Sequence, residues 1–234
     1  MWDYDLIYAG DRAGDHGLAV VKRPDIPAPV RDYTEVSIPG RDGSLYIDEG
    51  TVGDIVVSVT FNFMGRPDEW FGRFREAKRW LLQGGRKELQ FMDDAEYFYL
   101  AKKVVLDSAE RSCLRIGQFA ASFYCSGYHY LVDGKREYGL QEVRHNAFET
   151  SHPIYTIQGE GLCEIQVNNK AFRANVGQNA TIDTERMVTC RKDGTLMNTD
   201  VEGDYEDLYL IHGDNEIEAT PGFSVKVVPN WRRL

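Results

Sequence analysis

The sequence lacks the features that usually mark a secreted, membrane-spanning or zinc-binding protein. It has four cysteines in 234 residues, none of them in a Cys-x-x-Cys pair, and their spacing fits no zinc site. We therefore expect buried free thiols in a reducing compartment. No run of 18 apolar residues is present, and the first residues are acidic where a secretory signal is basic. These absences predict neither a transmembrane helix nor a signal peptide.

Positive charge is also scarce. The chain has 27 Lys and Arg against 37 Asp and Glu, a net charge of −10, and a pI near 5.0. Sequence-independent DNA binding needs clustered cations, so we expect no surface that holds DNA. An acidic protein can still lie beside DNA that it must not retain. The 42% hydrophobic and 12% aromatic content predicts one large or two small folded domains.

Catalytic and metal-binding motifs are equally scarce. The glycines Gly10, Gly14 and Gly17 lack the Lys-Ser/Thr pair of a phosphate loop. The acidic run 200–207 does not match a calcium-binding loop, and we interpret it as a solvated loop. Spacing neither reveals nor dismisses a Cys-His pair, since such pairs form in space. The sequence therefore indicates no catalytic residue, cofactor or metal ligand, and we expect no enzyme.

Only one strong helix pattern is present, over residues 67–83. Pro67 suits a first helical turn, and Gly84-Gly85 suits a helix end. Trp70, Phe74, Ala77 and Leu81 form an apolar stripe. Such a stripe usually packs on the domain's own sheet, and a partner-binding face is the alternative.

The remaining patterns predict β-strands. Residues 36–63 combine the turn dipeptides Pro39-Gly40 and Asp42-Gly43 with a strand over 55–63, in which apolar residues alternate with polar ones. Further short strands follow, including Leu114–Cys125, which we expect to be interrupted near Gly117. From residue 154 a second β series begins, with turns expected at Gly159-Glu160-Gly161 and Asn168-Asn169. We place two domains at residues 1–140 and 141–234, and we expect the last residues to pack back on the first domain.

The order of several motifs resembles that of siphophage distal tail proteins. The string IPGRDGSLYIDEG before a strand resembles their N-terminal signature, and KRWLLQGGRKELQF resembles their helix, glycine stop and next strand. HPIYTIQGEGLCEIQVNNKAF, ATIDTERMVTCRKDGTLMN and VKVVPNWRRL resemble successive parts of their C-terminal domain. The resemblance covers nearly the whole chain. Departures fall in loops, where Asn146-Ala147-Phe148, Gly203-Asp204-Tyr205-Glu206 and His212-Gly213-Asp214-Asn215 replace the usual turns.

The resemblance implies a mainly β fold: an N-terminal β-sandwich or split barrel with one helix and a hairpin arm, then a galectin-like β-sandwich. It implies a structural protein of the virion tail tip, made in the bacterial cytoplasm. Six copies would form a ring hub around a channel for DNA ejection. The hub would join the major tail tube protein to a tail-associated baseplate, fibre or lysin protein, and it would support receptor-binding proteins.

For the assembly interface we name four candidates: Arg41, Asp42, Val57 and Phe61. The two apolar residues fit a core at least as well as an interface. Two other functions remain open. A lectin-like adhesion protein would need exposed aromatic residues in the C-terminal domain, where Trp231 fits a terminal anchor better. A cell-wall hydrolase would need a catalytic site that the sequence does not reveal.

Overall fold

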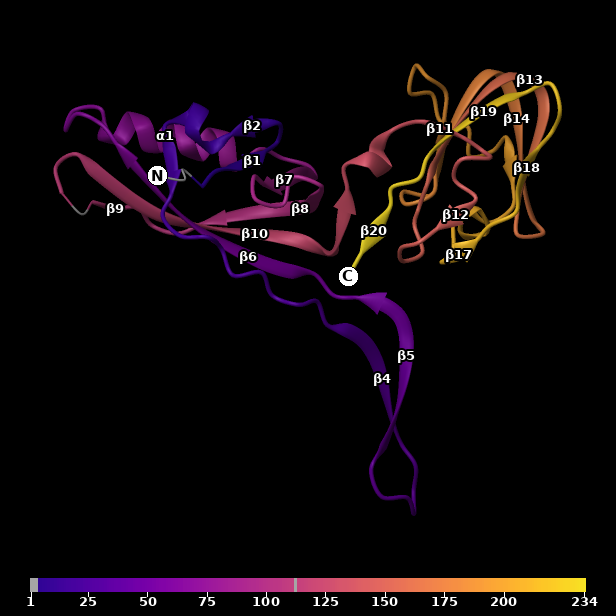
Figure 1. Ribbon diagram of the computed structural model, residues 1–234, viewed down its shortest axis with the longest axis horizontal. Coiled ribbons are helices and arrows are strands. Elements are labelled where there is room, and N and C mark those ends of the chain that lie inside the picture. Colours follow the sequence, from indigo (N-terminus) through magenta and orange to yellow (C-terminus); the bar gives the residue numbers. More distant parts are fainter. Residues whose placement is uncertain (1–3, 112) are drawn as a thin grey trace. The chain divides into compact units, whose positions relative to one another are not determined.

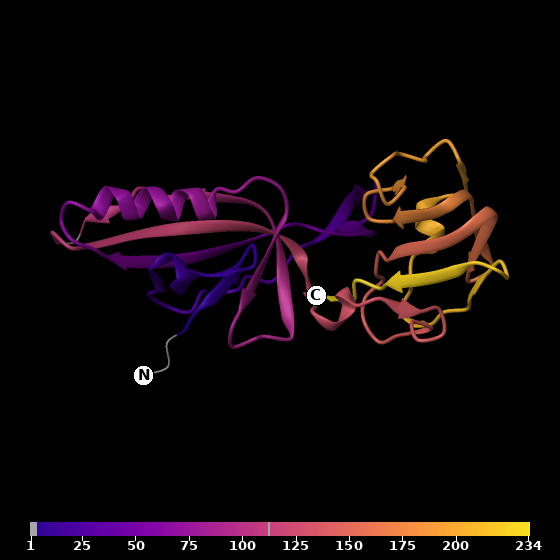
Figure 2. The same cartoon turned by 90° about the horizontal axis from the view of Figure 1, so that it is seen from above.

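The computed structural model describes residues 4–111 and 113–234. Contacts divide the chain into two compact units, Met1–His129 with Leu234 and Tyr130–Arg233 (Figures 1 and 2). Both units consist mainly of β-strands, and the described residues contain one α-helix. The expectation of a mainly β fold with one helix and a hairpin arm is confirmed. In the described chain, no helix is long and apolar enough to cross a membrane.

The first unit contains ten strands, a 3-10 turn and the helix. These are β1 (Leu6–Tyr8), β2 (Asp11–Arg12), η1 (Ala13–His16), β3 (Leu18–Val20), β4 (Arg31–Ser37), β5 (Ser44–Val52), β6 (Ile55–Met64), α1 (Trp70–Leu81), β7 (Lys87–Phe91), β8 (Tyr97–Leu106), β9 (Glu110–Arg111) and β10 (Ile116–Leu131). The main sheet has the order β2-β1-β7-β8-β10-β6-β3, and β9 pairs with β10. Strands β4 and β5 pair only with each other and form the hairpin arm.

The core of the first unit lies between its sheet and α1. Ile55, Val57, Val59, Phe61 and Phe63 alternate along β6, and all are buried. Phe61 lies opposite Phe119 of β10, with ring centroids 5.6 Å apart. The helix covers this face of the sheet (Figure 2). The period-2 pattern therefore marks the buried face, as the sequence predicted.

The helix is shorter than expected. It begins at Trp70 and ends at Leu81, because residues 67–69 form a turn. In that turn the Arg66 guanidinium donates to Glu69, with Nη2 2.6 Å from Oε1. Trp70, Ala77 and Leu81 are buried in the core, so the apolar stripe packs on the protein's own sheet.

Strand β10 runs without interruption through Gly117, which corrects the expected break. An ideal Cβ at Gly117 would lie 2.2 Å from Phe63 Cζ and 2.8 Å from Trp70 Nε1. Glycine is therefore required here for close packing, not for a turn.

The second unit is a β-domain that contains both short and long strands. Its elements are η2 (Asp133–Lys135), β11 (Tyr138–Gly139), β12 (His145–Asn146), β13 (Ile154–Val167), β14 (Lys170–Asp183), β15 (Val188–Cys190), β16 (Val201–Glu202), η3 (Tyr205–Leu208), β17 (Gly213–Asp214), β18 (Ile217–Ala219), β19 (Ser224–Val228) and β20 (Arg232–Arg233). The main sheet has the order β11-β19-β13-β14-β15. Strand β11, although it lies before residue 141, pairs with β19.

A long hairpin of β13 and β14 organises this unit. Its turn is Asn168-Asn169, with φ of 51° and 66°, as the sequence predicted. The expected turn at Gly159–Gly161 is wrong, because pairing with β14 continues through these residues. Gly159 and Gly161 adopt φ of 153° and 107°, which glycine accepts inside a strand.

The side chains of the C-terminal segment contact the second unit, although β20 pairs with β10 and Leu234 groups with the first unit. Trp231 is 8% exposed and belongs to the core, and Leu131 N donates to its carbonyl (2.9 Å). Arg232 Nε donates to Thr150 O (2.6 Å), and Asn230 Nδ2 donates to His152 O (2.9 Å). Trp231 is thus a terminal anchor, as its position beside Pro229 indicated.

Candidate functional site: the hairpin arm

The arm formed by β4 and β5 is a long element of the first unit that is exposed along almost its whole length. The two strands comprise sixteen residues, and all of them are exposed except Val36, Ser44 and Val52, which are half-buried. Strand pairing runs from Arg31 opposite Val52 to Ser37 opposite Ser44. A two-stranded hairpin that packs on nothing else is marginally stable in water. The arm is therefore a candidate surface for contact with another molecule.

The two faces of the arm differ in chemistry. Tyr33 and Tyr46 lie on one face with ring centroids 6.4 Å apart, beside Glu35 and Asp48. Val36, Leu45 and Ile47 lie on the other face, with Leu45 41% and Ile47 48% exposed. Apolar strand residues that face solvent are typical of interaction surfaces.

Polar contacts within the arm fix its shape. Thr51 Oγ1 donates to Asp32 (2.7 Å), and Thr34 donates to Glu49. Arg31 Nη1 lies 3.8 Å from Asp48. The arm carries five carboxylates, from Asp32, Glu35, Asp42, Asp48 and Glu49, and only two guanidinium groups, from Arg31 and Arg41, a net charge of −3. A cationic surface would complement it.

The base of the arm is closed by close backbone packing. Gly53 N donates to Val30 O (2.8 Å), so the two ends of the arm are adjacent. An ideal Cβ at Gly127 of β10 would lie 2.4 Å from Gly53 O and 2.9 Å from Val52 Cγ1. Only glycine at 127 lets β10 approach the base this closely.

The structure separates the four candidate interface residues into two pairs. Arg41 and Asp42 lie exposed in the turn at the tip of the arm, where Arg41 N donates to Ile38 O (3.2 Å). Val57 and Phe61 are 0% exposed and belong to the core. We therefore correct their assignment, because a side chain enclosed between sheet and helix cannot contact a partner. Sequence reasoning missed the exposed Tyr33, Leu45, Tyr46 and Ile47, although they flank the turn that it identified.

The cysteines do not match the expectation of four buried thiols. Cys125 and Cys163 are buried, Cys190 is half-buried and Cys113 is exposed. Burial raises the pKa of the Cys125 thiol to about 12, with a smaller effect from Asp54. Cys125 therefore stays protonated at neutral pH, which is unfavourable for a nucleophile.

The acidic run in the second unit is divided among separate ion pairs. Asp207 accepts from Lys170 Nζ (2.7 Å), and Glu202 lies 3.5 Å from Arg173. Among the described residues, no three His, Cys, Asp or Glu side chains converge to hold a metal ion. The expectation of a solvated loop is therefore corrected, because β16 and η3 carry most of residues 200–207 and two of the carboxylates pair with Lys170 and Arg173.

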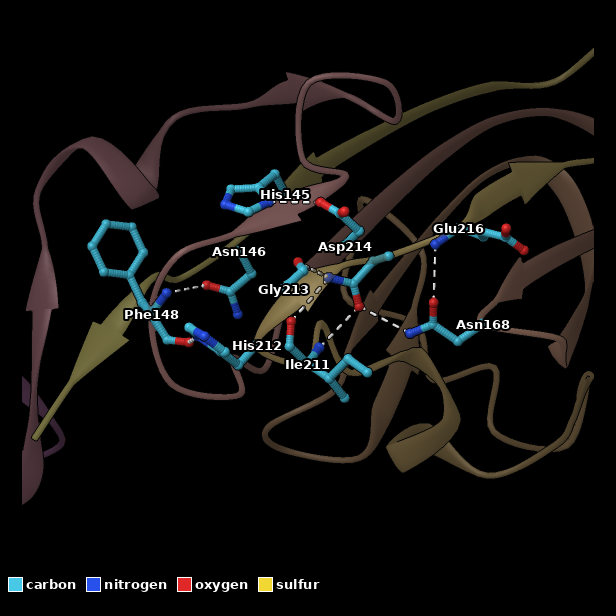
Figure 3. Close-up of polar contacts among 10 residues, drawn as sticks. His145, Asn146, Phe148, Asn168, Ile211, His212, Gly213, Asp214 and Glu216 are labelled. Atoms are coloured by element: carbon cyan, nitrogen blue, oxygen red, sulfur yellow. Dashed lines mark hydrogen bonds and ion pairs between the residues drawn. The ribbon is translucent and has the colours of Figure 1, made fainter.

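A partly buried amide network lies beside the β13–β14 turn (Figure 3). Asn215 Oδ1 accepts from Asn168 Nδ2 (2.9 Å) and Ile211 N (3.0 Å). Asn168 Oδ1 accepts from Glu216 N (2.9 Å). Asn215 Nδ2 donates to the carbonyls of Ile211 (2.9 Å) and Gly213 (3.2 Å). These bonds satisfy the amides and fix the loops, so we assign the network a structural role.

A polar cavity of about 270 Å³ lies near this network. It is lined by Arg144, Gln166, Asn169, Glu216 and Glu218. Nearby, His145 Nδ1 and Asp214 Oδ1 form an exposed pair at 2.7 Å (Figure 3). The lining contains no aromatic side chain on which a sugar ring could stack.

Comparison with solved structures shows that the fold is similar to that of a phage protein. No family profile and no curated protein matches the chain. Eight chains of solved structures match, and one of them is "SPP1 Dit (gp 19.1) Protein, a Paradigm of Hub Adsorption Apparatus in Gram-positive Infecting Phages". The alignment with it has a TM-score of 0.68 and 13% identity, and it covers 98% of each chain. The resemblance to distal tail proteins is thereby confirmed in fold.

Proposed function

We propose that this protein is a structural component of a siphophage tail tip, where it forms a ring hub. The observation that carries the proposal is the exposed arm, on a fold that matches a phage hub protein along its whole length. In the proposed ring, six copies join the tail tube to a tail-associated baseplate protein. The second unit supports receptor-binding proteins. The role is non-enzymatic, and the mechanism is binding.

The arm is the proposed assembly element. Val30 is 73% exposed, Tyr46 62% and Tyr33 51%, so contact with another copy would remove substantial apolar surface from water. Full burial of one such side chain contributes about 1.5–3 kcal/mol, and these side chains would gain roughly half of that. Arg41 and Asp42 at the tip remain proposed contacts.

The proposed channel would let DNA pass without holding it. On the face of the sheet opposite α1, the outward residues of β6 and β10 are uncharged: Val56, Ser58, Thr60, Asn62, Met64, Gln118, Ala120, Ser122, Tyr124, Ser126 and Tyr128. Ser58 and Ser122 hydroxyls lie 3.3 Å apart across the two strands. Lys103 of β8 contacts this face, with Nζ 4.1 Å from the centroid of the Tyr124 ring. A lining with few cations would bind phosphates weakly.

The alternative of a saccharide-binding adhesion protein has less support. Trp231 is buried in the core of the second unit, and the polar cavity lacks aromatic residues. Binding to a glycan array or in calorimetry would revive this alternative. Release of peptidoglycan by the purified protein would overturn the non-enzymatic role.

The test is the mass of the purified chain, alone and with its tail neighbours, by light scattering and negative-stain microscopy. We expect a ring for the wild type. Replacing residues 31–52 by Gly-Gly should give a folded monomer, because Val30 and Gly53 are already hydrogen-bonded. A wild-type chain that stays monomeric with every partner would refute the hub.

A further inference from the structure

A histidine in the second unit contacts the side chains that hold the C-terminal segment. The ring of His152 stacks on the ring of Tyr209, with centroids 4.1 Å apart and an interplanar angle of 18°. The Arg232 guanidinium lies beside both nitrogens of the histidine ring, with Nη2 3.0 Å from Nε2 and Nη1 3.5 Å from Nδ1. We call these three side chains the histidine latch.

Further hydrogen bonds hold the C-terminal segment to the chain around His152. Arg232 Nε donates to Thr150 O (2.6 Å), and Asn230 Nδ2 donates to His152 O (2.9 Å). Glu149 N donates to Arg232 O (3.1 Å). Arg232 therefore holds the segment in place through its backbone and its side chain, and its side chain also contacts a residue that can change its charge.

The contact with Arg232 requires a neutral His152. A guanidinium has N–H donors and no acceptor, so Arg232 can only donate to the imidazole. A neutral imidazole has one nitrogen with a free lone pair, and the shorter distance assigns that lone pair to Nε2. Protonation would make both ring nitrogens donors and would place two cations in contact. The geometry that holds the segment at neutral pH therefore opposes it once His152 is charged.

The surroundings of the latch do not offset this charge. The titratable and charged groups on the elements that pack around it are Glu149, Glu185, Glu206, Tyr209, Arg232 and Arg233. Burial lowers the pKa of His152 to about 4, with a smaller effect from Arg232. Among the described residues no carboxylate contributes to that shift, while Glu206 and Glu185 act on Tyr209. A proton on His152 would therefore be an uncompensated charge in a largely buried site.

We propose that the histidine latch releases the C-terminal segment, residues 230–233, when His152 is protonated. At neutral pH His152 accepts a hydrogen bond from Arg232 and the segment stays docked. Once His152 carries a proton, Arg232 is repelled and its hydrogen bonds to the neighbouring backbone open with it. The opening uncovers Trp231, which is 8% exposed in the docked segment and belongs to the core. The latch lies within the second unit, so the proposal does not depend on the hub.

Proton linkage sets the size and the direction of the effect. The pKa of His152 is about 4 when the segment is docked, and it returns toward the ordinary value of about 6.5 when the ring enters water. The docked form is therefore fully favoured above pH 6.5 and loses its advantage as the pH falls toward 4. Between pH 7 and pH 5, the ratio of open to docked segment should rise by up to about 20-fold.

The test is hydrogen exchange of the full chain at pH 7 and pH 5, followed by mass spectrometry and corrected for the intrinsic effect of pH on exchange. Peptides that contain Glu149 report on the latch, because its N–H donates to Arg232 O. Peptides from the β13–β14 hairpin report on the rest of the unit. We expect protection at Glu149 to fall by up to about 20-fold at pH 5, with the hairpin unchanged. An unchanged Glu149, or an equal loss in the hairpin, would overturn the proposal.

A matched pair of variants separates the latch from other effects of acid. His152→Gln keeps an oxygen that can accept from Arg232 but does not titrate, so its protection at Glu149 should change by less than about twofold. His145→Gln alters an exposed histidine of the same unit, which pairs with Asp214 (2.7 Å), and it should keep the full loss. The same loss in His152→Gln as in the wild type would refute the latch.

Nuclear magnetic resonance of histidine nitrogens in the wild type gives a readout that needs no variant. The chain has five histidines, and we expect one of them to stay neutral at pH 6 with an unprotonated Nε2. Its titration midpoint should lie below about pH 5. If no histidine titrates below that value, the proposal is wrong whatever the exchange data show.

Discussion

Replacing Phe61 by alanine should destabilise the first unit strongly, whereas replacing Tyr46 should leave its stability nearly unchanged. Phe61 is 0% exposed and packs on Phe119, so its truncation removes a buried ring and leaves a cavity. Phe-to-Ala changes at such sites cost about 3–5 kcal/mol. Even 3 kcal/mol would raise the unfolded fraction roughly 150-fold, since every 1.4 kcal/mol is about a factor of ten.

Tyr46 is 62% exposed, and the arm that carries it pairs with no other strand. Its replacement should change the free energy of unfolding by less than about 0.5 kcal/mol, as for most surface substitutions. The same replacement should weaken assembly of the proposed hub, because the aromatic side chain of Tyr46 would be lost from the proposed contact. The alanine variant at Phe61 should thus change the stability of the first unit, and the one at Tyr46 should change assembly alone.

The assay is urea unfolding followed by tryptophan fluorescence, in which Trp70 and Trp80 report on the core of the first unit. It should be run at concentrations low enough to keep the chain monomeric, since assembly would add apparent stability. A loss below about 1 kcal/mol for Phe61→Ala would refute the core assignment. A loss for Tyr46→Ala as large as that for Phe61→Ala would refute the claim that the arm is energetically separate.

Three further predictions concern glycines, a histidine and the thiols. Gly117→Ala should cost about 1–3 kcal/mol through overpacking against Phe63, while Gly72→Ala, with no atom within 4 Å of the new Cβ, should raise helix stability by about 0.5–1 kcal/mol in thermal melts. Burial, with a smaller contribution from Arg232, lowers the pKa of His152 to about 4. The unfolded state therefore binds more protons than the folded state between pH 6.5 and 4. The free energy of unfolding should fall as pH falls through that window, by up to about 2 kcal/mol after allowing for partial exposure. A wild-type free energy of unfolding that does not change with pH, or the same pH dependence in His152→Phe, would contradict this. Cys113 should react with a thiol reagent in the native protein, and Cys125 should react only on unfolding. Native wild type and native Cys125→Ser should therefore incorporate the same amount of reagent, and a larger amount in the wild type would contradict the burial of Cys125.

Local patterns predicted most elements of the fold, because each depends on neighbouring residues. The alternation along β6 and the Asn168-Asn169 turn follow from side-chain period and backbone preference. The errors arose where glycine has two meanings. Gly117 and Gly159 both looked like interruptions, yet each lies inside a continuous strand, where it makes room for an aromatic ring from another segment.

The candidate interface could not be predicted residue by residue. Val57 on β6 and Ile47 on β5 are both β-branched residues in alternating strands, but one is 0% and the other 48% exposed. The difference is that α1 covers β6, whereas no element among the described residues covers the arm, and this depends on tertiary packing. Sequence could locate the strands and the turn, but it could not say which strand lacks a partner.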